Sequence, residues 1–326
     1  MCDGGKAMVV GSAPLFGVLL ALVSAAVLAV GNLWQSRGVN LVSAAAEASG
    51  ENKTPFLALL RTPIWIAGSA LFGVAILLQM GSLAFAPLIL VQPIGVTALV
   101  FSAVLNARVR RKPLPRRVLL GIAISLIGVI AYVIIAALVS KQKPISDGQL
   151  SAILITLAAV LAIAAAIRFG TRGTAKAPIF YVVLGGIFSG FVATLGKTVI
   201  LRVETMFAGH RMVFDSGSVL TLICVLGIGV ASALSIYFVQ YSHTCNPPDV
   251  VIAGLTVVDP AVAVVLGITI LHEAAGAPVI SFVGFILAGA AAFIGVVILA
   301  RAENAEEDAQ STETIERGAQ RSAESA

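Results

Sequence analysis

Long apolar segments fill most of this chain, and short polar segments separate them. A helix needs about 20 apolar residues to cross the hydrocarbon core of a bilayer, where it satisfies its own backbone. The pattern predicts nine such helices, at residues 13–34, 62–83, 86–107, 118–140, 149–167, 178–201, 217–241, 247–271 and 277–300. The strands of a β-barrel would be shorter, and apolar and polar residues would alternate along them. The apolar runs in this chain are continuous. We therefore expect an all-α polytopic membrane protein.

The apolar pattern also predicts the domain organisation. We expect one transmembrane domain over residues 1–300, because the spans follow one another without a long polar insertion. The first apolar run follows Lys6 and is long enough to cross the bilayer, so we interpret it as a helix and not as a signal peptide. From Arg301 the chain becomes polar and rich in Ala, Glu and Ser. Such a composition buries too little apolar surface to fold alone, and we expect residues 301–326 to form a disordered tail.

Composition supports a membrane environment. Of the 326 residues, 59% are hydrophobic and 11% are charged, whereas soluble domains average roughly 45–50% and about 25%. The mean hydropathy is +1.02. Lipid is the predicted partner for this surface. The net charge of +5 does not indicate a nucleic-acid partner, because the basic residues lie in short loops between spans. The three cysteines show no metal-ligand spacing, and no cofactor is predicted.

The distribution of Lys and Arg predicts the orientation of the spans. Most of the Lys and Arg residues fall in the segments that follow the first, third, fifth and ninth predicted spans. Residues 108–117 alone contain six of them. Cytoplasmic loops carry the excess of positive charge in membrane proteins. We therefore expect the N-terminus outside, the C-terminal tail in the cytoplasm, and a location in the plasma (inner) membrane.

The two halves of the chain resemble each other weakly. The matched positions are Gln79 and Gln240, Pro87 and Pro248, Pro93 and Pro260, and Gly31 and Gly196. Helices one to four (about 13–140) then correspond to helices six to nine (about 178–300), and the fifth helix links them. An offset of five helices reverses the direction of crossing, so the repeats are predicted to be inverted. Inverted repeats allow one central site to open to either side, with Pro93 and Pro260 as predicted hinges.

The stretch from Trp65 to Ile134 resembles a known group of transporters, most closely at FAPLILVQPIG (85–95). The segment GFVATLGK (190–197) adds to the likeness. Both are similar to the drug/metabolite transporter superfamily, nearest to NIPA-type magnesium transporters and EamA-like permeases. The resemblance implies a transporter and not an enzyme. This chain departs from the family at Gln79 and Asn106, where relatives often carry acidic residues, which counts against magnesium specifically.

Asp259 is the sharpest candidate for chemistry, because it lies at the middle of a predicted span. A charged aspartate there costs roughly 2.5–3.5 kcal/mol on insertion scales, and such residues mark ion or proton paths. Pro260 also frees a backbone carbonyl one turn earlier, near Thr256, which can help to bind a cation. We predict a proton or metal-cation site. The alternative is a protonated or paired structural aspartate.

Four other polar residues lie within predicted spans. Lys197 lies near the outer end of its span, so it either reaches the headgroups or turns inward. Turned inward, it would be a counter-charge to Asp259 or a contact for an anionic substrate. Gln79, Gln92 and Gln240 are predicted to line a central path, with hydrogen bonding between helices as the alternative. Glu273 lies at an outer helix end, where we expect an interfacial residue.

These features together predict a secondary transporter that moves a small-molecule or ion substrate by alternating access. Asp259 would couple to a proton or cation, and the polar residues and prolines would line or gate the path. Magnesium and an organic metabolite or drug both remain open as substrates. The alternatives from other classes are a membrane scaffold for an envelope complex and a lipid flippase. A homodimer is one option for the assembly.

Overall fold

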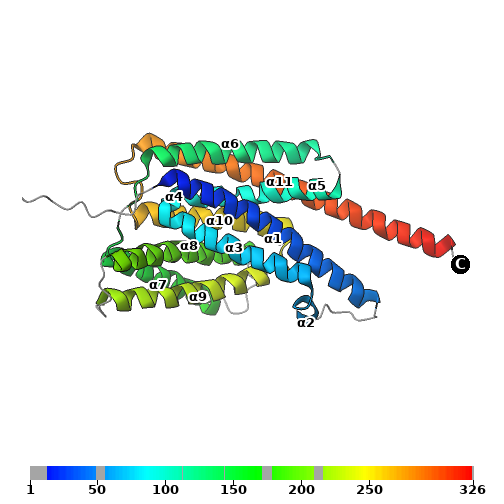
Figure 1. Ribbon diagram of the computed structural model, residues 1–326, viewed down its shortest axis with the longest axis horizontal. Helices are drawn as coiled ribbons and strands as arrows, with labels where there is room; N and C mark the ends of the chain where they lie inside the picture. Colours follow the sequence, from blue (N-terminus) through cyan, green and yellow to red (C-terminus); the bar gives the residue numbers. More distant parts are fainter. Residues whose placement is uncertain are drawn as a thin grey trace, which may run out of the picture.

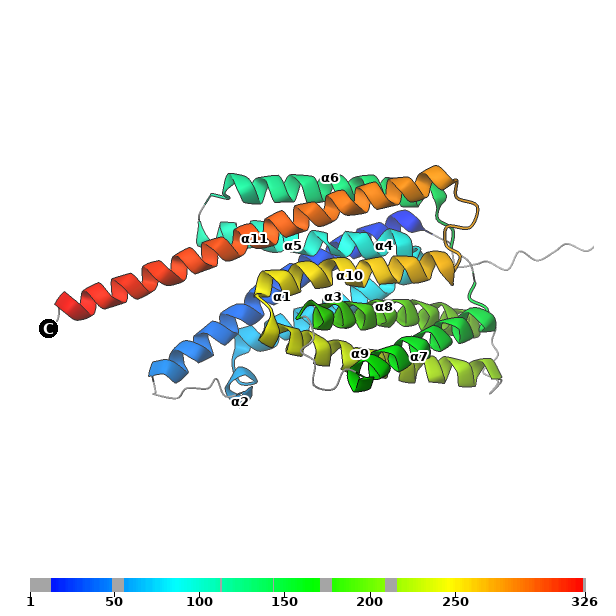
Figure 2. The ribbon, with the colours of Figure 1, turned by 180° about the vertical axis from the view of Figure 1, so that it is seen from behind.

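The computed structural model describes residues 13–48, 56–111, 113–142, 144–170, 178–208 and 216–324. Its helices are α1 (Pro14–Ala48), α2 (Phe56–Leu59), α3 (Pro63–Phe85), α4 (Leu88–Gly95), α5 (Thr97–Arg110), α6 (Arg116–Val139), α7 (Asp147–Gly170), α8 (Ile179–Ala208), α9 (Ser216–Cys245), α10 (Pro248–Thr269) and α11 (Val279–Glu324). They form an elongated bundle whose long helices run along roughly one direction (Figures 1 and 2). The described residues contain no strand, so the predicted all-α fold is confirmed for them.

The predicted membrane spans are confirmed in number and place. In the ranges described above, nine helical segments are long and apolar enough to cross a bilayer, and each overlaps one predicted span. Large aliphatic side chains on their outer faces, such as Leu77, Ile127 and Leu138, are mostly exposed. An apolar surface of this extent belongs in contact with lipid and not with water.

The third span is interrupted at one residue, Val96, whose backbone angles stay helical (φ −58°, ψ −30°). Helix α4 ends at Gly95, α5 begins at Thr97, and the N–H of Val96 turns back to the carbonyl of Pro93. Proline lacks an N–H, and its ring crowds the carbonyl four residues earlier, which interrupts regular helical bonding. Helix α10 also contains a proline, Pro260, but it continues as one helix.

Helices α4 and α8 lie at the centre of the bundle. Every side chain from Leu88 to Ile94 in α4 is buried, and α8 contributes the fully buried Phe188, Phe191 and Leu195. A helix that is apolar on all sides belongs inside a protein core. The central position of these two helices places their polar residues away from lipid.

Small residues allow the outer helices to pack closely. Helix α1 lies along α3, α6 lies along α11, and α8 lies against α9 and α10. At the α6–α11 contact, a Cβ atom on Gly128 would collide with the backbone of Ala292, and one on Gly295 would collide with the backbone of Ser125. Such contacts between backbones are a main source of helix association in membranes.

The C-terminal segment differs from the sequence expectation. Residues 301–324, expected to form a disordered tail, continue α11 as helix to Glu324. Ala, Glu, Gln and Arg favour helix, and the segment contains no proline. The helix satisfies its own backbone and therefore needs no core. It projects beyond the bundle toward the C-terminus (Figure 1).

Candidate functional site

Asp259 lies near the middle of the α10 span and faces α8. Its Oδ2 accepts a 2.6 Å hydrogen bond from the hydroxyl of Ser189. Its Oδ1 is buried and has no hydrogen-bond partner among the residues that the structure describes. Buried polar atoms are nearly always satisfied. One carboxylate oxygen is therefore available inside the span.

Two glycines of α8 bring Ser189 to this carboxylate. A Cβ on Gly190 would lie 2.9 Å from the carbonyl oxygen of Asp259, and one on Gly186 would lie 2.6 Å from the Cβ of Val258. Only glycine therefore lets the two helices approach so closely at this point. The glycine pair positions the serine hydroxyl as well as packing the helices.

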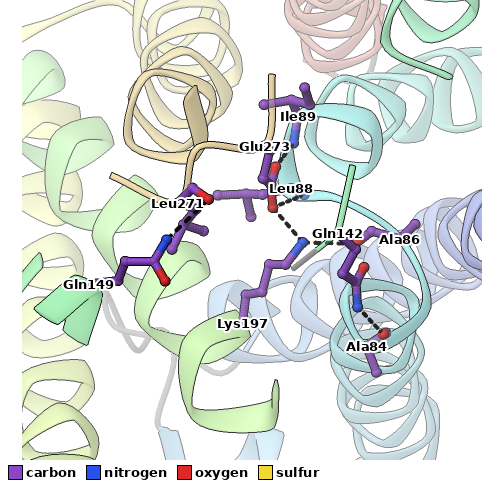
Figure 3. A network of polar contacts seen from close by, with 9 residues as sticks. All are labelled: Ala84, Ala86, Leu88, Ile89, Gln142, Gln149, Lys197, Leu271 and Glu273. Atoms are coloured by element: carbon purple, nitrogen blue, oxygen red, sulfur yellow. Dashed lines mark hydrogen bonds and ion pairs between the residues drawn. The ribbon is translucent and has the colours of Figure 1, made fainter. Parts of the chain in front are cut away.

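A second buried polar site joins the two halves of the chain (Figure 3). Lys197 of α8 forms a 2.6 Å ion pair with Glu273, which follows α10, and the exposed fractions of their side chains are 1% and 3%. Lys197 also donates to the carbonyl of Ala86 at 3.0 Å. The two carboxylate oxygens of Glu273 accept the N–H groups of Leu88 and Ile89, each at 2.9 Å.

Further hydrogen bonds tie the neighbouring loops into this site. The N–H of Lys141 donates to the carbonyl of Glu273 at 2.8 Å. Gln142 Nε2 donates to Ala84 at 2.7 Å, and Gln149 Nε2 donates to Ile270 and Leu271 at 3.1 and 3.2 Å. The segments that follow α3, α6 and α10 are thus held together at one end of the bundle (Figure 3).

The electrostatics of the two acids differ. Glu273 is paired with a cation, accepts two backbone N–H groups and lies at the N-terminus of α4, where the helix dipole favours a negative charge. A buried ion pair needs such additional bonds to offset the loss of water. Asp259 has one hydroxyl partner and no cationic partner in the described part of the chain. Both carboxylate oxygens of Glu273 are therefore satisfied, whereas Asp259 keeps one oxygen without a partner in the described residues.

A cavity of about 340 Å³ lies between α4, α6, α10 and α11. Both predicted hinge residues, Pro93 and Pro260, line it together with Thr256 and Tyr132. Because Pro260 has no N–H, the carbonyl of Thr256 loses its helical donor. The Thr256 hydroxyl is already bonded to the carbonyl of Ile252 at 2.7 Å. Asp259 does not line this cavity, so the predicted site residues fall into separate places.

The structure decides between the alternatives for Lys197. Its side chain turns inward, and its partners are Glu273 and Ala86. The suggestion that it serves as counter-charge to Asp259 is therefore wrong. Glu273 is buried, and the expectation of an interfacial residue is also wrong. In the sequence, the indication that Lys197 and Glu273 meet is that both lie near the predicted outer ends of their spans.

The three glutamines predicted to line one path do not gather in one place. Gln92 is buried in α4, Gln79 is half-buried in α3, and Gln240 is exposed on α9. The exposure of Gln240 follows from the position of α9 at the edge of the bundle (Figure 2). The glutamines that do bond between segments are Gln35, Gln142 and Gln149. They lie outside the predicted spans or at a span's first turn, and the hydrophobic pattern gave no reason to select them.

In the described parts of the chain, no three His, Cys, Asp or Glu side chains lie close enough to hold a metal ion together. At the contact between α8 and α10, the oxygen atoms that could bind a cation are those of the Asp259 carboxylate and the Ser189 hydroxyl. Such a small set of oxygen ligands suits a cation that keeps part of its water shell, or a proton.

Nine bilayer-length helices in the described residues define the class of this protein as a polytopic membrane protein. The comparison with protein families then gives the particular group. The chain belongs to the magnesium transporter NIPA family, whose family model matches residues 13–306. The resemblance seen in the sequence is confirmed.

Individual relatives agree with this assignment. An uncharacterized protein of Corynebacterium glutamicum is 28% identical over 265 residues, which cover 79% of this chain and 86% of the relative. The probable magnesium transporter NIPA1 of Arabidopsis thaliana is 26% identical over 59% of this chain and 58% of its own length. The mouse magnesium transporter NIPA4 is 24% identical over 60% and 50%. No solved structure matches the chain.

Proposed function

We propose that this protein is a secondary transporter that carries Mg²⁺ across the plasma membrane by alternating access. Membership of the magnesium transporter NIPA family and the names of two relatives support magnesium over an organic substrate. The observation that carries the proposal is the buried, unpartnered oxygen of Asp259 at the middle of a bilayer-spanning helix. A carboxylate is retained at such a depth at a considerable energetic cost, which a transported cation offsets.

Asp259 and Ser189 supply the ligands that magnesium prefers. Mg²⁺ is bound by oxygen atoms, keeps several of its waters and needs only one or two carboxylates from the protein. The Asp259 carboxylate would bind the hydrated ion through Oδ1, while Ser189 holds Oδ2 in place. The same carboxylate can exchange the cation for a proton, which would couple the two movements.

Two inverted repeats are the proposed moving parts. In this arrangement, α1, α3, α4, α5 and α6 form the first repeat, α7 links, and α8 to α11 form the second. Pro93 and Pro260 occupy equivalent positions in the two repeats, and both line the cavity between them. Weakened helical bonding at each proline would let α4 and α10 bend as the repeats rock.

The Lys197–Glu273 pair is the proposed closed gate. It joins the start of α4, in the first repeat, to α8 and the end of α10 in the second. Arg202 and Asp147 form a separate and more exposed ion pair between α8 and α7, with a distance of 2.6 Å, which is not part of the proposed gate. Asn32 takes the place of Lys197 in the first repeat, and it is exposed. With the N-terminus outside, the end that the Lys197–Glu273 pair closes faces the outside of the cell. The opposite end would then give the cation access from the cytoplasm.

Mg²⁺ uptake into proteoliposomes tests the proposal. We expect Asp259→Asn to reduce uptake at least tenfold, because the amide removes the charge while keeping the shape. Asp147→Asn is the matched control, since the same change falls on an exposed carboxylate at a helix end, and it should keep at least half of the uptake. Wild-type uptake by the Asp259→Asn protein would exclude this carboxylate from transport.

A further inference from the structure

A second cavity, of about 390 Å³, lies where α5 ends and the chain turns toward α6. The residues that line it are Val104, Ala107, Arg108, Arg111, Pro113 and Leu114. Arg108 and Arg111 are exposed. The cavity therefore combines two guanidinium groups with an apolar wall at the end of two bilayer-spanning helices.

The segment that forms this cavity carries positive charge without an acidic residue of its own. Arg108, Arg111, Arg116 and Arg117 form no ion pair with the side chains that the structure describes, and the sequence contains no Asp or Glu from residue 52 to residue 146. The first turn of α6 also lacks an acidic residue. Unneutralised arginines that repel one another are stabilised by a bound anion.

The kind of basic residue narrows the choice of anion. Orientation in the membrane needs only positive charge, and Lys serves it as well as Arg. Arg presents a planar fork of donors that matches the oxygen atoms of a phosphate group. The loop contains five arginines and one lysine between residues 108 and 117, a composition suited to phosphate recognition.

We propose that this arginine-lined cavity binds the phosphate group of an anionic phospholipid. Its position at the ends of α5 and α6 is the level at which headgroup phosphates lie, and basic pockets between helices bind anionic headgroups there. Val104 and Leu114 would contact the glycerol and the first methylene groups of the lipid. Arg108 and Arg111 would bind the phosphate oxygens.

The acidic segment after Ala302 is the competing occupant. Leu299 and Ala302 pack near Leu114 and Val118, and the sequence beyond them contains Glu303, Glu306 and Glu307. However, α11 continues straight past this end of the bundle and away from it (Figure 2).

The experiment measures the melting temperature of the purified full-length protein in detergent. Phosphatidylglycerol, phosphatidylcholine and inorganic phosphate are added separately. We expect phosphatidylglycerol to raise the melting temperature and the other two to leave it unchanged. An equal shift with phosphatidylcholine would overturn the charge argument, and an equal shift with inorganic phosphate would overturn the lipid source.

Variants assign the effect to this cavity. Arg108→Gln with Arg111→Gln should abolish the shift, whereas Arg37→Gln with Arg61→Gln, on another loop, should keep it. Arg108→Lys with Arg111→Lys retains the charge that orients the loop, so the protein folds and inserts normally, and it should lose most of the shift. A full shift in the lysine variant would overturn the proposal. So would a shift that appears only when the chain is truncated after Ala302, since the tail would then be the occupant.

Discussion

Glu273, which is buried, and Asp259, which is half-buried, have different surroundings. Glu273 receives hydrogen bonds from Lys197 and two backbone N–H groups, so each of its oxygens is satisfied. Asp259 keeps one oxygen without a partner in the described structure. A buried carboxylate without partners is costly, and it persists where a ligand or proton completes it. The contrast supports the proposal that Asp259, and not Glu273, binds the transported cation.

The ion pair permits a quantitative prediction for stability. Removing one partner of a buried pair leaves an uncompensated charge and costs about 3–5 kcal/mol. We therefore expect Lys197→Met and Glu273→Gln each to lower the free energy of unfolding by about that amount. The double variant has no unpaired charge and should be more stable than the Lys197→Met variant. Unfolding by denaturant in mixed micelles measures all three.

A double-mutant cycle separates the pair from the rest of the site. The Gln side chain at position 273 can still accept one of the N–H groups of α4, so the cycle isolates mainly the ion pair. If the loss of unfolding free energy in the double variant equals the sum of the losses in the two single variants, the two side chains do not interact. The gate role further predicts that Mg²⁺ leaks through the single variants that still fold.

At the scale of the helices, glycine contacts determine how closely α6 and α11 pack. Gly295 lies against the backbone of Ser125, while Gly73 of α3 has nothing within 4 Å of an added Cβ. The same substitution at these two sites therefore has opposite expected effects. The difference depends on tertiary contact alone, because both glycines lie inside bilayer-spanning helices.

We expect Gly295→Ala to destabilise the protein by about 1–3 kcal/mol, because a backbone contact cannot relax around the new methyl group. Gly73→Ala should leave stability unchanged or raise it by up to about 1 kcal/mol, since alanine favours helix over glycine. The melting temperatures of the two purified variants, compared with that of the wild-type protein, test these expectations. Equal effects at both sites would contradict the close α6–α11 packing.

At the scale of the whole molecule, the direction of insertion determines on which side of the membrane the proposed Lys197–Glu273 gate lies. Lys141, exposed after α6, lies at the gate end of the bundle, and Cys245, exposed at the end of α9, is separated from it by three spans. Three crossings place the two positions on opposite faces of the membrane. The excess of basic residues in residues 108–117 predicts that the Cys245 face is cytoplasmic.

Labelling with a membrane-impermeant maleimide tests this orientation. In intact cells we expect Lys141→Cys, in a background of Cys2→Ser and Cys245→Ser, to react. Native Cys245, in a Cys2→Ser background, should react only in inverted vesicles. The reverse pattern would contradict the predicted orientation, and reaction of both positions from one face would contradict the nine-span arrangement.

The sequence by itself determined the membrane class, the nine spans and the position of Asp259 within a span, since each depends on local composition. Transfer of a segment into lipid is governed by its own hydropathy, so no tertiary information is needed. The repeats, the orientation and the role of Asp259 stay predictions.

Only the tertiary structure decided which polar groups meet. Lys197 and Glu273 are separated by 76 residues, and their pairing depends on how α8, α4 and the end of α10 pack together. The exposure of Gln240 likewise depends on the position of α9 in the bundle. Lipid accepts many helix arrangements equally well, and the contacts between specific side chains and glycines select one of them.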